Sequence, residues 1–200
     1  MPPTAADITA AVERCQPLIR RTPVVDTAAG DLGIGVGAAI KLESLQYAGS
    51  FKARGSLNNA LASDIPASGL IAASGGNHGI AVARTARVLG VPAEIFVPSV
   101  SAKAKVQRIR AQGATVHVTG ALYDDAQAAC DARAAESGAL NIHPYDSTHT
   151  VAGQATLGVE LGEQVPDVDT VVVAVGGGGL IAGIRLALPR VRIVAVETPT

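Results

Sequence analysis

The chain has 200 residues, of which 48% are hydrophobic and only 2% aromatic, so a sizeable core must be built from aliphatic side chains. Its formal net charge is −1 and no long basic or acidic run is present, which argues against nucleic-acid and membrane partners recognised through bulk charge. No apolar run reaches membrane-spanning length, the N-terminus lacks a signal-peptide core, and Cys15 and Cys130 stand alone. We therefore expect a cytoplasmic protein with two free thiols.

Helical patterns and short apolar runs alternate along the chain. An amphipathic helix is predicted at 5–20, ending before Pro23, and it is followed by a strand at 38–43 and a helix at 51–63. The next predicted elements are strand 69–74, helix 77–90, strand 93–98, helix 101–113 with Ser101 as its N-cap, strand 114–119, helix 122–138 and a strand at about 139–142. The last are helix 150–164, strand 168–175, helix 180–188 and strand 191–197.

The predicted strands are short, rich in β-branched residues and without polar alternation, which is typical of strands buried on both faces of a parallel sheet. The pattern predicts an α/β protein of the doubly wound type. Strand and helix alternate most regularly from 69 to about 142, which suggests an inserted small domain. We predict a small α/β domain at 65–146 and a larger domain formed by 1–64 and 147–200.

One strand end carries the sequence "VGGGGL". Ligands of such sheets bind beyond the carboxyl ends of the strands. Consecutive glycines let the backbone approach a ligand closely, and the following helix offers free N–H groups and its positive end, so a phosphate suits this loop. Gly177, Gly179 and Glu197 also fit a dinucleotide-binding pattern, so an NAD-type oxidoreductase that uses the 176–183 loop stays an alternative.

A second strand end carries "SGGNHG" at 74–79. The hydroxyl of Ser74, the amide of Asn77 and the imidazole of His78 meet several backbone N–H groups at one helix start. This combination suits a carboxylate or an oxyanion. An ordinary capping loop, in which Ser74 or Asn77 satisfies helix N–H groups, explains the same residues equally well.

Lys52 lies at a predicted helix start in "SLQYAGSFKARGS". The helix dipole disfavours a positive charge there and lowers the pKa of the amine. A neutral lysine amine is a nucleophile that forms a Schiff base with an aldehyde. A phosphate loop together with such a lysine indicates pyridoxal 5'-phosphate (PLP) as the cofactor.

The sequence resembles the threonine/serine dehydratases among the fold-type II PLP enzymes, the tryptophan-synthase-β-like group. The resemblance covers nearly the whole chain and lies in "RTPVVDT", "KLESLQYAGSFKARGSLNNAL", "SGGNHG", "KAKVQRIRAQGATV", "IHPYDSTHTVAGQATLGVEL" and "VVVAVGGGGLIAGI". It implies two open α/β sheets of the parallel type, a small amino-acid substrate and a homo-oligomer. It also implies that the C-terminal part of the catalytic domain, with the residue facing the pyridine nitrogen and most of a cation site, is absent here; no metal site is predicted.

The resemblance implies a role for each matching residue. Lys52 would bind the cofactor covalently and act as the catalytic base, Phe51 would pack near the cofactor ring, and Asn77 would hydrogen-bond the ring's 3'-hydroxyl. The phosphate would be held by backbone N–H groups of Gly176, Gly177, Gly178, Gly179 and Leu180. The substrate carboxylate would be bound by Ser74, Gly75, Gly76, Asn77 and His78.

The implied reaction is α,β-elimination of ammonia from L-threonine or L-serine. Ala53, directly after the lysine, differs from the acidic residue that is typical of the cysteine and threonine synthases. The similar racemases have a serine two residues before the asparagine, where this chain has Gly75. A serine racemase, a β-replacement synthase and a catalytically inactive PLP-binding protein remain alternatives.

Overall fold

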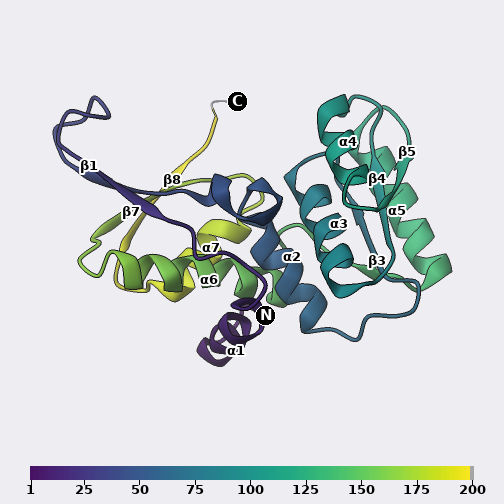
Figure 1. Ribbon diagram of the computed structural model, residues 1–200, viewed down its shortest axis with the longest axis horizontal. Coiled ribbons are helices and arrows are strands. Elements are labelled where there is room, and N and C mark those ends of the chain that lie inside the picture. Colours follow the sequence, from purple (N-terminus) through teal and green to yellow (C-terminus); the bar gives the residue numbers. More distant parts are fainter. Residues whose placement is uncertain (199–200) are drawn as a thin grey trace.

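The computed structural model describes residues 1–198 and has two lobes with α2 (Lys52–Leu61) between them (Figure 1). The last two residues of the predicted 147–200 segment lie outside the described residues. Both lobes combine helices with parallel strands, so the predicted α/β class is confirmed. The predicted domain boundaries themselves stay a prediction.

The four-stranded lobe contains residues 70–141. Its parallel sheet has the strand order β5-β4-β3-β6 and three helices cover it. The strands are β3 (Leu70–Ala73), β4 (Ala93–Val97), β5 (Thr115–Val118) and β6 (Leu140–Asn141), and the helices are α3 (Asn77–Leu89), α4 (Lys103–Arg110) and α5 (Tyr123–Ser137).

The central strand β3 is buried at every residue. Because successive side chains of a strand point to opposite faces, Leu70 and Ala72 join the cluster with α3 and α4, and Ile71 and Ala73 join the cluster with α5. This packing is the reason for the continuous apolar run in the sequence.

The α6–α7 lobe contains the remaining elements. They are α1 (Ala5–Cys15), β1 (Val24–Thr27), β2 (Ala38–Lys41), the 3-10 turns η1 (Glu43–Leu45) and η2 (Tyr47–Gly49), α2, α6 (Thr148–Gln164), β7 (Thr170–Ala174), α7 (Gly179–Ala187) and β8 (Arg192–Val196). Strands β7 and β8 pair in parallel, whereas β1 and β2 pair antiparallel. The strand at 24–27 was not predicted, and the pairing of 38–41 departs from the expected parallel arrangement.

Two other local predictions were wrong. The first helix ends at Cys15 rather than at residue 20. Gln16 keeps helical φ/ψ and its N–H still bonds to the carbonyl oxygen of Val12, but Pro17, the next residue, has no N–H to continue the helical hydrogen bonds. Ser101 does not cap α4; the N-cap is Ala102 and no side chain bonds to the free helix N–H groups.

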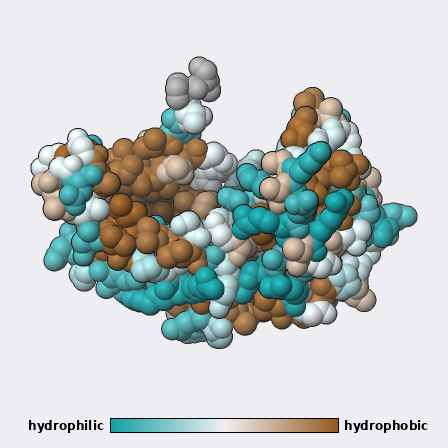
Figure 2. Space-filling model, turned by 45° about the horizontal axis from the view of Figure 1, so that its top comes forward, coloured by the Kyte–Doolittle hydropathy of each residue, from teal (hydrophilic) through white to brown (hydrophobic). Residues whose placement is uncertain are grey.

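The predicted burial of all strands on both faces holds for the central strands β3 and β4 and fails for the edge strand β5, where Val118 is 53% exposed, and for β7 and β8. Val172 is 68% exposed and Val196 is 48% exposed. Helices α6 and α7 lie along one side of this strand pair, and hydrophobic side chains gather at the surface of this lobe in Figure 2. The described elements therefore cover only one face of the β7–β8 pair.

Candidate active site

Lys52 is the first residue of α2, where the sequence predicted a helix start. The chain reaches this point through the η2 turn, in which Ala48 and Gly49 both have positive φ, and then through extended Ser50. Its amine donates a 2.7 Å hydrogen bond to the carbonyl oxygen of Pro144. Partial burial of the side chain lowers the pKa of Lys52, so the direction expected from the helix start is found, with desolvation as its cause.

The glycine-rich loop connects the carboxyl end of β7 to the first turn of α7. Gly178 has φ +81°, which only glycine adopts without strain. A Cβ added at Gly176 or Gly178 would meet nothing within 4 Å, so open space lies beside the loop at both positions. The first N–H groups of α7 have no partner within the helix and give this end of the helix a partial positive charge.

Lys52 and the glycine-rich loop line one cavity of about 360 Å³. Phe51 and Tyr145 complete its wall, and the loop contributes residues from Ala174 to Ile181. A half-buried amine with a lowered pKa thus shares a cavity with a helix N-terminus whose backbone carries no side chains at the glycines. This arrangement can hold a phosphate at one end and present a nucleophile to a carbonyl carbon at the other.

The "SGGNHG" loop lies at the carboxyl end of β3 and does not line this cavity. Asn77 is the first residue of α3, and the hydroxyl of Ser74 accepts a 3.2 Å hydrogen bond from the N–H of Gly76. His78 turns inward: it is 5% exposed and its Nε2 lies 2.7 Å from the carbonyl oxygen of Ile142, which only a donating N–H satisfies.

Burial, with a smaller contribution from the nearby charge of Lys52, lowers the pKa of His78 to about 3. The imidazole is therefore neutral near pH 7 and committed to a structural hydrogen bond. Ser74, Asn77 and the backbone N–H groups remain the groups of this loop that could meet a ligand.

Tyr145 and Pro144 belong to the site although the sequence assigned them no role. They lie between β6 and α6, and β6 is parallel to β3 in the same sheet. Parallel neighbours end at one edge of a sheet, so the "HPYD" segment lies at the same edge as the "SGGNHG" loop. The position of this segment directly after a predicted strand was the signal that could have identified it.

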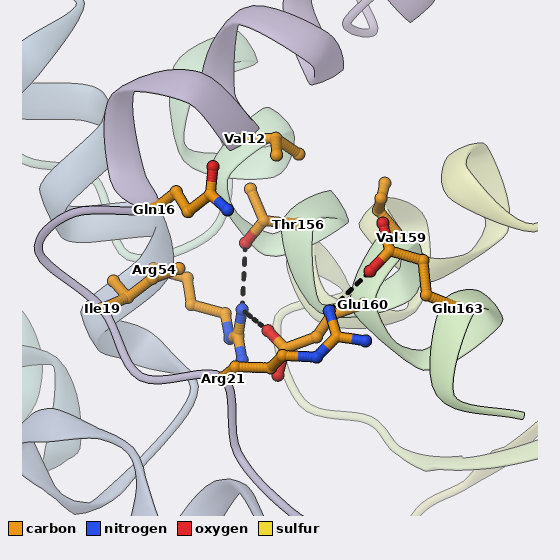
Figure 3. Close-up of a pocket in the computed structure, with 9 residues that line it drawn as sticks. All are labelled: Val12, Gln16, Ile19, Arg21, Arg54, Thr156, Val159, Glu160 and Glu163. Carbon is orange, nitrogen blue, oxygen red and sulfur yellow. Dashed lines mark hydrogen bonds and ion pairs between the residues drawn. The ribbon is translucent and has the colours of Figure 1, made fainter.

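A network of buried charges holds the first turn of α2 from the other side. Arg54 is fully buried and pairs with Glu43 at 2.7 Å and with Glu160 at 2.8 Å; Lys41 pairs with Glu160 at 2.6 Å. Figure 3 shows Arg54 beside Thr156 and Glu160 at a pocket between α1, α2 and α6. Because the two cations and two carboxylates of this network pair with one another, the network offers no unpaired charge of its own to a ligand in that pocket.

Comparison with known proteins identifies the family. Residues 15–199 match the family described as "Pyridoxal-phosphate dependent enzyme". The chain is 41% identical over 192 residues to the L-threonine ammonia-lyase of Geobacter sulfurreducens, a match that covers 93% of this chain and 48% of that protein. The chain therefore belongs to the pyridoxal-phosphate dependent enzyme family, whose cofactor is PLP.

Solved structures agree with this assignment. Maize serine racemase superposes with a TM-score of 0.94 at 36% identity, covering 98% of this chain and 62% of that one. A threonine deaminase from T.th. superposes with a TM-score of 0.91 at 38% identity, covering 98% and 65%. The predicted fold-type II architecture is confirmed, and the chain spans about half the length of the curated relatives that it matches.

Proposed function

We propose that the protein is a PLP-dependent ammonia-lyase that converts L-threonine, L-serine or both into a 2-oxo acid and ammonia. The observation that carries the proposal is the cavity that the half-buried Lys52, with its lowered pKa, lines together with the open glycine-rich loop. The similarity to proteins named threonine ammonia-lyase and threonine deaminase supports it. A dinucleotide would not require Lys52, and the family assignment removes support from that alternative.

The residues of the cavity fit PLP. The backbone N–H groups from Gly176 to Leu180 and the positive end of α7 would hold the phosphate, and the open space at Gly176 and Gly178 leaves room for its oxygens. Phe51 would form a wall of the ring site, and Lys52 would bind the aldehyde carbon. We propose Asn77 as the hydrogen-bond partner of the 3'-hydroxyl.

Bound PLP supplies an electron-withdrawing ring that makes the Cα proton of an attached amino acid acidic. Ser74, Asn77 and the backbone N–H groups of Gly75, Gly76 and His78 would bind the substrate carboxylate. Lys52, released as a free amine, would take the proton from Cα, and its lowered pKa keeps a larger share of the amine neutral for that task. The β-hydroxyl would take up one proton, which balances the proton that Lys52 removed from Cα, and leave as water. The released enamine would tautomerise to an imine, which water hydrolyses to the 2-oxo acid and ammonia.

A serine racemase is the second candidate because maize serine racemase is among the closely superposing structures. Racemisation needs an acid on the face of Cα opposite Lys52, and Gly75 has no side chain to supply one. A β-replacement synthase is disfavoured because Ala53, not an acidic residue, follows the lysine. Elimination remains the function that the site supports best.

The test begins with the purified protein and PLP. We expect a yellow protein, and we expect borohydride to fix the cofactor to Lys52, located by mass spectrometry of peptides. Incubation with L-threonine and with L-serine should then yield a 2-oxo acid and ammonia in equal amounts. A colourless protein, or a label on another lysine, would remove the basis of the proposal.

None of the helices described in residues 1–198 has the length and apolar character needed to cross a bilayer. The cytoplasmic location and the homo-oligomer stay predictions from the sequence and the resemblance.

A further inference from the structure

The ring of Tyr145 lies directly over the glycine-rich loop. A Cβ built on Gly177 would lie 2.5 Å from Cγ and 2.6 Å from Cε1 of Tyr145. A Cβ on Gly179 would lie 3.0 Å from Cβ of Tyr145. Any side chain at Gly177 would thus collide with this ring, so the absence of a Cβ there serves the contact with Tyr145.

The backbone around Tyr145 is held in place by the same short segment that contacts Lys52. The Nδ1 of His143 accepts a 2.8 Å hydrogen bond from the N–H of Asp146 and a 3.4 Å bond from the N–H of Tyr145. The rings of His143 and Tyr145 pack edge to face with centroids 4.8 Å apart. One turn therefore fixes both the carbonyl oxygen of Pro144 that receives the amine of Lys52 and the aromatic ring beside the loop.

We propose that Tyr145 is a further cofactor-binding residue, whose ring closes the phosphate end of the cavity. The proposal rests on the proposed function, because it assumes that the loop holds the phosphate of PLP. The aromatic ring lies against the loop at Gly177, between the open positions Gly176 and Gly178. By excluding water from this side it strengthens the hydrogen bonds that the loop N–H groups give to a bound phosphate.

The contact assigns this effect to the ring of Tyr145 and not to its hydroxyl. The atoms that approach Gly177 are the ring carbons Cγ, Cδ1 and Cε1. The residue is 40% exposed, so it contributes little to the hydrophobic core and its removal should leave the fold intact. Loss of the ring should therefore weaken phosphate binding selectively.

The experiment compares Tyr145→Ala and Tyr145→Phe with the wild type in titrations with PLP and with pyridoxal, which lacks the phosphate. We expect Tyr145→Ala to raise the Kd for PLP about tenfold and to leave the Kd for pyridoxal within about twofold. Tyr145→Phe keeps the ring and should bind PLP like the wild type. Tyr123→Ala, which removes a tyrosine that is 48% exposed on α5, is the matched control and should bind both compounds normally.

Each outcome decides one point. An unchanged Kd for PLP in Tyr145→Ala, or equal losses for PLP and pyridoxal, would overturn the role of Tyr145 at the phosphate. A loss in Tyr145→Phe as large as in Tyr145→Ala would overturn the assignment to the ring. A wild-type protein that binds no PLP would instead refute the proposed function, together with this role. Melting temperatures of all variants show whether any loss of binding is only a loss of folding.

Discussion

The two glycine-rich loops look alike in the sequence, yet their glycines serve different purposes. Loop 74–79, here called the closed loop, is closed at two of its three glycines: a Cβ on Gly75 would strike Ser101, and a Cβ on Gly79 would strike the carbonyl oxygen of Ser74, whereas a Cβ on Gly76 would meet only Oγ of Ser74 at 3.8 Å. Loop 176–179 is open at two positions, Gly176 and Gly178, where an added Cβ meets nothing within 4 Å. Both loops follow a parallel strand and start a helix.

This difference between the loops distinguishes two reasons why a position requires glycine: close packing within the protein and close approach of a ligand. In the closed loop Gly75 and Gly79 allow the chain to pack against itself, as Gly177 and Gly179 allow the close contact with Tyr145, and a larger residue at these positions would cost folding free energy. In the open loop Gly176 has no packing neighbour to explain it, so the bare backbone there serves something that the protein binds. Substitutions at Gly75 or Gly79 should therefore lower the free energy of unfolding, whereas a substitution at Gly176 should weaken ligand binding.

The largest expected effect lies beside the open loop. Lys52→Ala should lower the rate of 2-oxo acid formation by about 10³-fold or more, because the site loses its nucleophile and its base together. The fold should remain, since burial disfavours the charged amine that is removed. Initial rates with L-threonine and circular dichroism check both statements.

Lys103→Ala is the matched control for Lys52, because Lys103 is an exposed lysine at the first position of α4. This variant should retain full activity. If Lys52→Ala kept more than a trace of turnover, the catalytic role of Lys52 would be wrong.

The next effect tests the comparison between the loops directly. Gly79→Ala should destabilise the protein by about 1–3 kcal/mol, because its Cβ meets Ser74, Ile95 and Ile109. Gly176→Ala should leave the free energy of unfolding within about 0.5 kcal/mol and should weaken PLP binding instead. Urea unfolding and PLP titration of both variants provide the measurements.

Gly176 is a cleaner probe than Gly178, whose positive φ would add backbone strain to any substitution. The distinction between the loops fails if Gly176→Ala unfolds readily or if it binds PLP as tightly as the wild type.

An effect that depends on pH is expected from the buried histidine of the closed loop. The pKa of His78 is about 3 in the folded protein and near 6.5 when unfolded, so the unfolded state binds more protons between these values. The free energy of unfolding should fall as the pH drops below about 6.5, with His78 contributing up to about 1.4 kcal/mol per pH unit. His78→Gln, which can still donate to Ile142, should show a shallower fall in urea unfolding between pH 7 and pH 4. Parallel curves for the two proteins would show that His78 is not the titrating group.

Much of this architecture could be predicted from the sequence because local rules decide it. The uninterrupted apolar run of β3 predicts a central strand, and Gly90 ends α3 in the left-handed conformation. The two glycine-rich loops and Lys52 lie at the strand ends and helix start where they were expected. Each of these features can be recognised from the residues of one short segment, without knowledge of the rest of the fold.

The rest depends on contacts between distant segments. Nothing near Ser101 in the sequence indicates that its hydroxyl lies against Gly75 instead of capping α4. The position of Tyr145 over Gly177 joins the segment that follows β6 to the loop that follows β7, and the exposure of β7 depends on which elements pack against it. A pattern in one segment cannot show such contacts.

The smallest expected effect is the rate of racemisation, which depends on position 75, where the similar racemases have a serine. Gly75 cannot carry a proton to Cα, so wild-type protein should form D-serine at less than about 1% of the rate of pyruvate from L-serine. Chiral chromatography beside a pyruvate assay measures both products. D-serine formed at a rate comparable to pyruvate would contradict the prediction.

The structure adds a condition to this test. A Cβ at residue 75 would run into Oγ of Ser101 and lie 2.7 Å from its Cβ, so Gly75→Ser alone should be destabilised and should gain no racemisation. The double variant Gly75→Ser/Ser101→Gly removes the obstacle and should form D-serine faster than the wild type. Ser101→Gly alone is the control for the double variant. The same variant also decides the result if the wild type does racemise L-serine. If the wild type racemises L-serine and Ser101→Gly does not, then the hydroxyl of Ser101 supplies the proton that the missing side chain at Gly75 cannot.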